Sequence, residues 1–330
     1  MSVLLATYNG SRYLEDQIRS LNQNSTPFTL DWLDDHSSDN TRSVVRKIAR
    51  DASMVLREWH QAQHLGLPGS FFQLVECVEA DVYLFCDQDD IWEPGKIDAT
   101  VAHLLGYFGT PTLCFSDSIL FYEGAPTACR RWSEVIGKKK VSKALRKPPM
   151  FEMFSRAIAP GHTQGFTRPL REIYLTHREI ARKHAFMHDW WMHDIAIASG
   201  VVHFLSDVPT VFWRQNPDGF CEGLRARTRK WIRDWRTMQL FRRVMSRHAR
   251  GFILAAPTLP PGKHLERLLG IAKLIEALDL QQTPAALFRL ARCGALPQTS
   301  YSTFYFLISC LLSNAVPVEP TSHNESRAAK

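Results

Sequence analysis

The chain has 330 residues, of which 45% are hydrophobic and 22% charged. These proportions are typical of a globular protein and exclude a disordered tail, a collagen-like repeat and a disulfide-rich miniprotein. Its 40 Lys and Arg against 33 Asp and Glu give a formal net charge of +7, which is compatible with a nucleic acid, an anionic membrane or a phosphorylated ligand and selects none of them. The length suggests one large domain or two ordinary ones.

The seven cysteines are scattered, and no two of them form a C-x-x-C pair. This argues against a zinc ribbon and a disulfide framework, and it favours a reducing compartment. Met1 to Thr7 runs directly into an apolar segment without a basic region, so we expect no secretory signal. The apolar run Tyr301–Val316 is too short and too interrupted by polar residues for a membrane span, so a buried or interfacial helix is expected there.

Short apolar runs alternate with amphipathic segments in the first third of the chain. The runs predicted as strands are Ser2–Thr7, Phe28–Leu33, Met54–Trp59 and Asp81–Cys86. Helical periodicity lies between them, so the pattern predicts a parallel, doubly wound sheet. In such sheets, ligands bind beyond the carboxyl ends of the strands. Three polar turns follow these ends and predict a site there: Thr7-Tyr8-Asn9, Asp34-Asp35 and Asp87-Gln88-Asp89-Asp90.

The next part of the chain is more varied. A strand is predicted over Leu113–Leu120 with Asp117 inside it, followed by a basic loop over Lys138–Lys147. A helix rich in Trp and His is predicted over His184–Gly200. Strands are predicted over Val201–Leu205 and Thr210–Trp213.

The run Asp87-Gln88-Asp89-Asp90 places three carboxylates within four residues. Because they repel one another, they need solvation or a neutralising cation. Oxygen ligands at a strand end suit Mg or Mn shared with substrate phosphates, whereas a solvated acidic loop is the alternative. The buried strand that precedes the run and the second acidic turn at Asp34-Asp35 favour the cation.

Several motifs carry a family resemblance. The segments LLATYNG, LDDHSSDNT, FCDQDDIWEPGKI, MHDWW and FWRQN occur in this order between Ser2 and Asn216. Together they resemble family-two glycosyltransferases of the rhamnosyltransferase-like branch. The resemblance implies an α/β GT-A fold, a Rossmann-like mostly parallel sheet with flanking helices, over residues 1–222. Residues 1–112 would be the nucleotide-binding half, residues 113–222 the acceptor half, and residues 223–330 a C-terminal helical extension.

The resemblance also implies roles for the residues of the polar turns. Tyr8 would stack on the nucleotide base, with Thr7 in the same loop. Asp35 would accept a hydrogen bond from the base, Asp87 would contact the ribose, and Asp89 would hold a divalent cation, Mn or Mg. Such a cation stabilises the negative charge of a diphosphate leaving group.

Asp189 lies among the bulky aromatic side chains of Trp190 and Trp191. Desolvation there would raise its pKa and make it a better base. By resemblance Asp189 is the catalytic base of a direct displacement with inversion; taken alone, it also fits a helix cap or an ion pair. His184 and His188 stand four residues apart and suggest zinc, but the segment lacks the H-E-x-x-H pattern of zinc hydrolases.

One position departs from the family pattern. The family's Y-R-Q-H segment ends in a histidine that completes the metal site, and here the segment reads Trp213-Arg214-Gln215-Asn216. Asn216 is a weaker, neutral ligand. His162 is a residue that could take its place.

The segment Leu224–Arg250 carries ten Lys and Arg against one acid, so it contributes +9 and the rest of the chain −2. Its apolar residues form one helical stripe, comprising Trp231, Trp235, Met238, Phe241 and Met245. Such a helix fits an anionic membrane surface, or it packs on the catalytic domain by its stripe with a solvated basic face. No nucleic-acid recognition motif accompanies the charge.

Together these features predict an inverting transferase for cell-surface polysaccharide assembly. It would move a sugar, such as rhamnose or another hexose, from a dTDP- or UDP-sugar to a glycan or lipid-linked glycan acceptor. It would work in the cytoplasm as a peripheral protein at the inner face of the cell membrane, without nucleic acid as a partner. Two alternatives stay open: a catalytically silent relative that binds glycan or nucleotide, and a membrane-associated adaptor in which the basic helix is the functional part.

Overall fold

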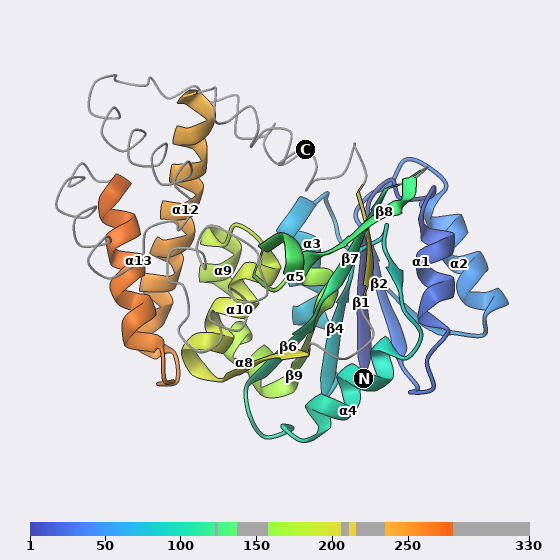
Figure 1. Cartoon of the computed structure of the whole chain (residues 1–330), viewed down its shortest axis with the longest axis horizontal. Coiled ribbons are helices and arrows are strands. Elements are labelled where there is room, and N and C mark those ends of the chain that lie inside the picture. Colours follow the sequence, from blue (N-terminus) through green and yellow to red (C-terminus); the bar gives the residue numbers. More distant parts are fainter. Residues whose placement is uncertain (123–124, 137–157, 206–210, 216–234, 280–330) are drawn as a thin grey trace.

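The computed structural model describes residues 1–122, 125–136, 158–205, 211–215 and 235–279 of the chain (Figure 1). Two β-sheets form its centre. The larger has seven strands in the order β10-β6-β9-β4-β1-β2-β3, and the smaller has four in the order β5-β11-β7-β8. The first seven elements alternate between strand and helix: β1 (Ser2–Thr7), α1 (Leu14–Leu21), β2 (Thr29–Asp34), α2 (Thr41–Asp51), β3 (Val55–Trp59), α3 (Gly66–Cys77) and β4 (Val82–Cys86).

These seven elements confirm the predicted α/β alternation, with strand bounds shifted by one residue or less. In the large sheet β1, β2, β3 and β4 are parallel to one another. Strands β1, β2 and β4 are buried on both faces, because alternate side chains enter different cores, whereas the edge strand β3 is partly exposed. Leu4 and Phe85 belong to one core and Val3 and Leu84 to the other. Continuous apolar runs are therefore what this sheet requires.

The middle of the chain adds strands to both sheets. Its elements are β5 (Ile91–Trp92), α4 (Lys96–Leu105), β6 (Thr112–Ser116), β7 (Ser118–Tyr122), β8 (Ala125–Arg131), α5 (Trp132–Ile136), the 3-10 turn η1 (Gly161–Thr163) and β9 (Gln164–Thr167). Strand β9 is antiparallel to both of its neighbours, β4 and β6. Because it runs backwards, the residues that precede it lie at the edge where β4 ends, so η1 reaches the predicted site.

The single strand predicted over Leu113–Leu120 is wrong. The chain turns at Asp117, so that β6 lies in the large sheet and β7 in the small one. The buried Asp117 carboxylate needs hydrogen-bond donors, and the turn supplies them through the backbone N–H groups of Ser118 (3.0 Å) and Ser133 (2.9 Å).

The remaining elements form a helical layer and the last strands. They are α8 (Arg168–Thr176), α9 (Arg178–His184), α10 (His188–Ser199), β10 (Val201–Leu205), β11 (Val211–Arg214), α12 (Trp235–Ala255), the 3-10 turn η2 (Ala256–Thr258) and α13 (Leu265–Asp279). The strands predicted over Val201–Leu205 and Thr210–Trp213 are confirmed within one residue. The helix predicted over His184–Gly200 is shorter: Ala185 is extended, and α10 begins only at His188.

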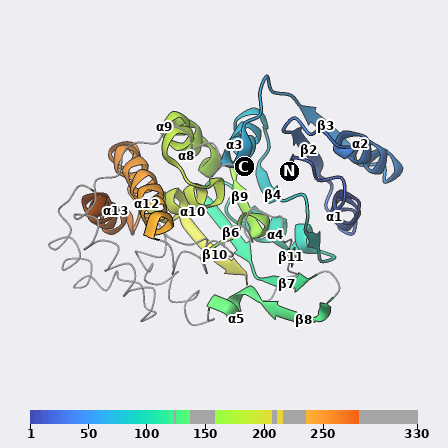
Figure 2. The same ribbon diagram turned by 90° about the horizontal axis from the view of Figure 1, so that it is seen from above.

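Helices α12 and α13 lie side by side next to α9 and α10 (Figures 1 and 2). Met245, Ala249 and Phe252 of α12 are buried in the same core as α10, whereas Arg247 and Arg250 are exposed. Met245, the stripe residue whose side chain is described, therefore packs into the core that α12 shares with α10, while the basic face at Arg247 and Arg250 is exposed. Trp231, the side chains of Trp235, Met238 and Phe241, the basic loop Lys138–Lys147, Asn216 and the run Tyr301–Val316 lie outside the described part of the chain. Within the part that the structure describes, we find no helix with the length and apolarity needed to cross a bilayer.

Candidate active site

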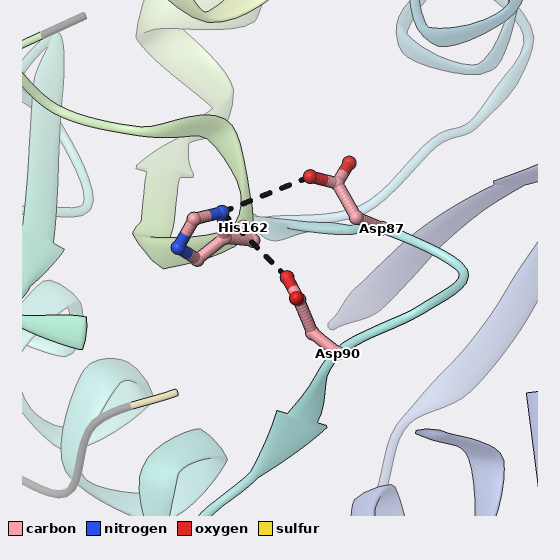
Figure 3. Close-up of side chains that lie close together, drawn as sticks. All are labelled: Asp87, Asp90 and His162. Carbon is pink, nitrogen blue, oxygen red and sulfur yellow. Dashed lines mark ion pairs between the residues drawn. The ribbon is translucent and has the colours of Figure 1, made fainter. Parts of the chain in front are cut away.

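Three potential metal ligands converge where β4 ends. The carboxylates of Asp87 and Asp90 and the imidazole of His162 point toward one another (Figure 3), and one ligand atom from each lies within 4.8 Å of the others. His162 Nδ1 is 3.7 Å from Asp87 Oδ2 and 3.6 Å from Asp90 Oδ2. Asp87 and Asp90 come from the turn after β4, and His162 comes from η1. Residues that are far apart in the sequence thus form one cluster.

The cluster has the properties of an incomplete cation site. Asp90 is fully buried, and its Oδ2 has no hydrogen-bond partner. Burial and the negative charges of Asp89 and Asp87 raise the pKa of Asp90 well above its usual value. Burial also lowers the pKa of His162, which keeps the imidazole neutral and able to act as a ligand. A divalent cation would remove the repulsion between the carboxylates and occupy the unpartnered oxygen, and two carboxylates with an imidazole suit Mn.

Arg214 fixes the position of the acidic turn by two hydrogen bonds. Its backbone N–H donates to Asp90 Oδ1 (3.0 Å), and its Nε donates to the carbonyl oxygen of Asp89 (2.8 Å). Its guanidinium lies against the rings of Tyr13 and Phe121. In the sequence, this role is indicated by an arginine at the end of the apolar strand V-F-W-R. The family resemblance assigned no role to Arg214.

Asp89, the predicted metal ligand, is not a member of the cluster. Its side chain is partly buried, and its pKa is raised to about 7, first by burial and then by the charge of Asp87. It lies between two members of the cluster in the same turn. Its role as a ligand stays a prediction, whereas Asp90 and His162 form the geometric cluster with Asp87.

Asp189, the predicted base, lies in the first turn of α10 and is attached to the same 3-10 turn as His162. Its Oδ2 accepts a hydrogen bond from the backbone N–H of Gly161 (3.0 Å), and its Oδ1 accepts one from the N–H of Trp190 (2.9 Å). Burial raises its pKa to about 7, with a further contribution from the charge of Asp87. Through Gly161, the Asp189 carboxylate is joined to the residue next to His162 of the cluster.

Gly161 has to be a glycine because the histidine before Asp189 approaches it closely. A Cβ at Gly161 would lie 2.9 Å from His188 Nε2 and 3.3 Å from Asp189 Cβ. The His188 ring stacks on Phe71 with centroids 4.0 Å apart, so it has little room to retreat. Gly161 is therefore a site residue that the motifs alone did not indicate.

The first strand supplies the predicted nucleotide loop. Thr7 is buried; its hydroxyl donates to Asp34 (3.0 Å) and accepts from Trp32 Nε1 (2.9 Å). The Tyr8 side chain is 48% exposed, and its ring centroid is 4.6 Å from that of His64. A face of an exposed aromatic ring is available for stacking.

Gln88 ties this loop to the acidic turn. Its side-chain amide accepts from Tyr8 N–H (2.9 Å) and donates to the Tyr8 carbonyl oxygen (3.1 Å). The amide lies so close to Gly10 that a Cβ there would be 2.3 Å from Gln88 Oε1. Two hydrogen bonds thus join the predicted nucleotide loop directly to the turn that carries the cation cluster.

Asp35, predicted to bind the base, is buried and engaged with the chain itself. Its carboxylate accepts from the backbone N–H groups of Leu65 (2.8 Å) and Gly66 (2.7 Å) and from the Gln61 amide, and it lies 3.0 Å from His64 Nδ1. In this structure Asp35 organises the loop before α3, which carries the His64 ring beside Tyr8. Its contact with a base stays a prediction.

Comparison with known proteins agrees with these observations. Residues 2–158 match the model of glycosyl transferase family 2. A curated relative, dTDP-rhamnosyl transferase RfbG of Shigella flexneri, is 24% identical over 220 residues, which are 64% of this chain and 71% of the relative.

Two solved structures share the fold. They are residues 1–349 of S. aureus TarS and the mannosyltransferase PcManGT of Pyrobaculum calidifontis, each with a TM-score of 0.50. Their identities are 14% and 16%; each covers 95% of this chain, and the match covers 90% and 86% of theirs, respectively. The sheet order and the likeness to these structures show that the chain has the GT-A fold, and its residues 2–158, which include the acidic turn after β4, match glycosyltransferase family 2.

Proposed function

We propose that this protein is an inverting, cation-dependent glycosyltransferase that takes its sugar from a nucleoside diphosphate donor. The observation that carries the proposal is that η1 connects the cation cluster to the Asp189 carboxylate. His162 completes a cluster with Asp87 and Asp90, and its neighbour Gly161 holds Asp189. A site that handles a diphosphate and a hydroxyl needs a cation cluster and a base close together.

The proposed roles follow from the chemistry of each group. Asp87, Asp90 and His162 would hold Mn or Mg, with Asp89 available from the same turn. The cation, when bound, stabilises the negative charge of the diphosphate leaving group. Tyr8 would stack on the nucleotide base in the loop that Thr7 and Gln88 anchor.

Asp189 is the proposed base. It would take the proton of the acceptor hydroxyl while the acceptor oxygen bonds to the anomeric carbon and the bond to the diphosphate oxygen breaks. One displacement of this kind inverts the configuration at the anomeric carbon. A buried carboxylate with a pKa of about 7 is suited to a base, because it is substantially ionised at neutral pH and still binds a proton readily.

The relatives support a nucleotide-sugar donor. The Shigella flexneri relative is a dTDP-rhamnosyl transferase, and PcManGT was solved with GDP-Man and Mn2+. We propose a dTDP- or UDP-sugar as the donor, with rhamnose as the first sugar to test, and a glycan or lipid-linked glycan as the acceptor in cell-surface polysaccharide assembly. The basic face of α12 supports work at the inner face of the cell membrane.

A thermal-shift screen of sugar nucleotides with and without Mn tests the proposal. Binding to the folded state raises the melting temperature by mass action, so a true donor should raise it only when Mn is present. Donor hydrolysis or transfer in the same samples should disappear in Asp189→Asn. Donor binding without any turnover would instead indicate a catalytically silent relative, and the absence of any nucleotide effect would overturn the proposal.

A further inference from the structure

The helix that carries the proposed base begins without a side-chain cap. Met187 is the N-cap residue of α10, and its side chain makes no capping hydrogen bond; within the first turn, Asp189 itself accepts the N–H of Trp190. Asp189 is the second residue of this helix. Because uncapped helix ends fray, the direction of the Asp189 carboxylate depends on what fixes the chain just before it.

His248 of α12 contacts that segment directly. Its Nδ1 accepts the backbone N–H of Phe186 (3.1 Å), and its Nε2 lies 3.0 Å from Asp194 Oδ2 further along α10. His248 and Asp194 are both fully buried. Since Nδ1 accepts a hydrogen bond, Nε2 carries the proton and donates it to Asp194. The ring therefore links the backbone before α10 to a carboxylate within α10.

The packing around His248 reinforces this link. The rings of Trp190 and Trp191 meet the His248 ring edge to face, with centroids 6.2 Å and 5.8 Å away. One turn along α12, a Cβ at Gly251 would lie 2.5 Å from His184 Cβ, at the end of α9. α12 is thus pressed against the junction of α9 and α10, where the chain turns toward Asp189.

We propose that His248 is a positioning residue for the base. It fixes Phe186, and through the next three residues it fixes the start of α10 and the carboxylate of Asp189. This inference rests on the proposed function, because it takes Asp189 as the base. It makes the C-terminal helix pair a part of the catalytic unit rather than an attachment.

Two substitutions in the full chain separate the two bonds of His248. An asparagine amide reaches about as far as Nδ1, so His248→Asn can still accept from Phe186. A glutamine amide reaches about as far as Nε2, so His248→Gln can still donate to Asp194 but leaves Phe186 without an acceptor. The readouts are hydrogen exchange of the peptides that cover residues 185–189, followed by mass spectrometry, and steady-state kcat and KM.

We expect H248Q to speed exchange of the Phe186 amide by about tenfold, because that amide loses its hydrogen bond. The variant should lower kcat by roughly tenfold through misplacement of Asp189, while KM for the donor stays unchanged. H248N should stay within about threefold of the wild type in both measurements.

His177 provides a matched control. It is also buried, and it also joins the C-terminal region to the domain, with Nδ1 2.7 Å from the Ile173 carbonyl oxygen and Nε2 2.9 Å from Thr258 Oγ1. It does not contact the segment before α10. His177→Gln should therefore lower the melting temperature without changing exchange at residues 185–189.

The inference would be overturned if H248N lost as much kcat as H248Q. It would also be overturned if His177→Gln lost as much kcat as H248Q. If H248Q does not fold, a tenfold loss of kcat in H248N, which keeps the acceptor for Phe186, would also overturn the inference. If the wild type turns over no donor, the proposed function fails, and the exchange measurement still shows whether His248 holds Phe186.

Discussion

The backbone N–H of Gly161 donates a hydrogen bond of 3.0 Å to the carboxylate of Asp189. The next residue, His162, lies 3.6 Å from Asp90 in the candidate cation cluster. Two adjacent residues of one 3-10 turn therefore join the proposed base to the proposed metal ligands. A substitution among the proposed metal ligands should therefore affect the proposed base, and a substitution beside the base should affect cation binding.

The rate of transfer should depend on the ionisation of Asp189. Burial raises its pKa to about 7, and only the ionised form can accept a proton. Activity should therefore fall by about tenfold per pH unit below this value and level off above it. Because the Asp87 charge contributes to the shift, saturating Mn should move the inflection to lower pH.

Initial rates between about pH 5 and pH 9 check this prediction, and Asp189→Asn should lower kcat by roughly 10²–10⁴-fold. Asp81→Asn is the control, because Asp81 is an exposed carboxylate just before β4, at the end of the strand away from the acidic turn. A pH profile without an inflection near neutrality would contradict the assignment of Asp189 as the base.

Asp90→Asn should change stability and cation binding in opposite directions. Without a cation, the substitution removes a buried charge with an unpartnered oxygen and keeps an acceptor for Arg214 N–H. We expect a gain in the free energy of unfolding on the order of 1 kcal/mol at neutral pH. The folded-state pKa of Asp90 lies above its unfolded value, so the gain should shrink as the pH falls toward 4, where the unfolded carboxyl becomes protonated.

Thermal denaturation with and without Mn tests both effects in one experiment. The wild type should gain stability from Mn, and Asp90→Asn should gain much less because it has lost a ligand. His162→Ala should also lose the response to Mn. Unlike Asp90→Asn, it should not be more stable than the wild type when Mn is absent. An Asp90→Asn variant that keeps the full response to Mn would remove Asp90 from the set of ligands.

Gly161→Ala should impair catalysis more than its small size suggests. The added Cβ would be 2.9 Å from His188 Nε2, and the stacked His188 ring can move only by displacing Asp189 or Phe71. We expect a loss of kcat of roughly 10–100-fold and a destabilisation of about 1–3 kcal/mol. Gly109→Ala is the matched control, because a Cβ there meets no atom within 4 Å. Equal kinetics of the two variants would contradict the prediction.

Tyr8→Ala should weaken donor binding and leave the Mn response intact. The Tyr8 side chain is 48% exposed, so its removal should have little effect on folding. Stacking of a base on an aromatic side chain contributes about 1–3 kcal/mol, which corresponds to a loss of donor affinity of roughly 5–150-fold. Isothermal titration with the nucleoside diphosphate measures this loss. Tyr8→Phe should retain most of the affinity, and a Phe variant as weak as the Ala variant would argue against stacking.

The fold was predictable because its strands have an unambiguous pattern. Val82–Cys86 is buried on both faces, and only a continuous apolar run can fill such a strand. The polar residues Ser116-Asp117-Ser118 interrupt the apolar run, but they do not by themselves show that the chain leaves one sheet for another. The partner that stabilises the turn, Ser133, lies 16 residues further along the chain.

The site was predictable in part for a similar reason. Asp87 and Asp189 lie in compact motifs that a family resemblance can identify. The cluster of Asp87, Asp90 and His162 depends instead on the reversed strand β9, which brings η1 to the end of β4. Spacing along the sequence contains no information about that reversal. The contacts of Arg214 and Gly161 with the acidic turn and with Asp189 join parts of the chain far apart in sequence, so the motif around Arg214 does not reveal them.

The position of β9 also determines which truncated fragments of this protein can form the large sheet. In the large sheet β4 and β6 are each paired with β9 and not with each other. A fragment that stops at residue 158, where the family match ends, would lack β9 and leave two apolar strands with open edges. It would also retain Asp87 and Asp90 while losing His162 and Asp189. The region that defines the family by sequence is therefore smaller than the unit that can fold.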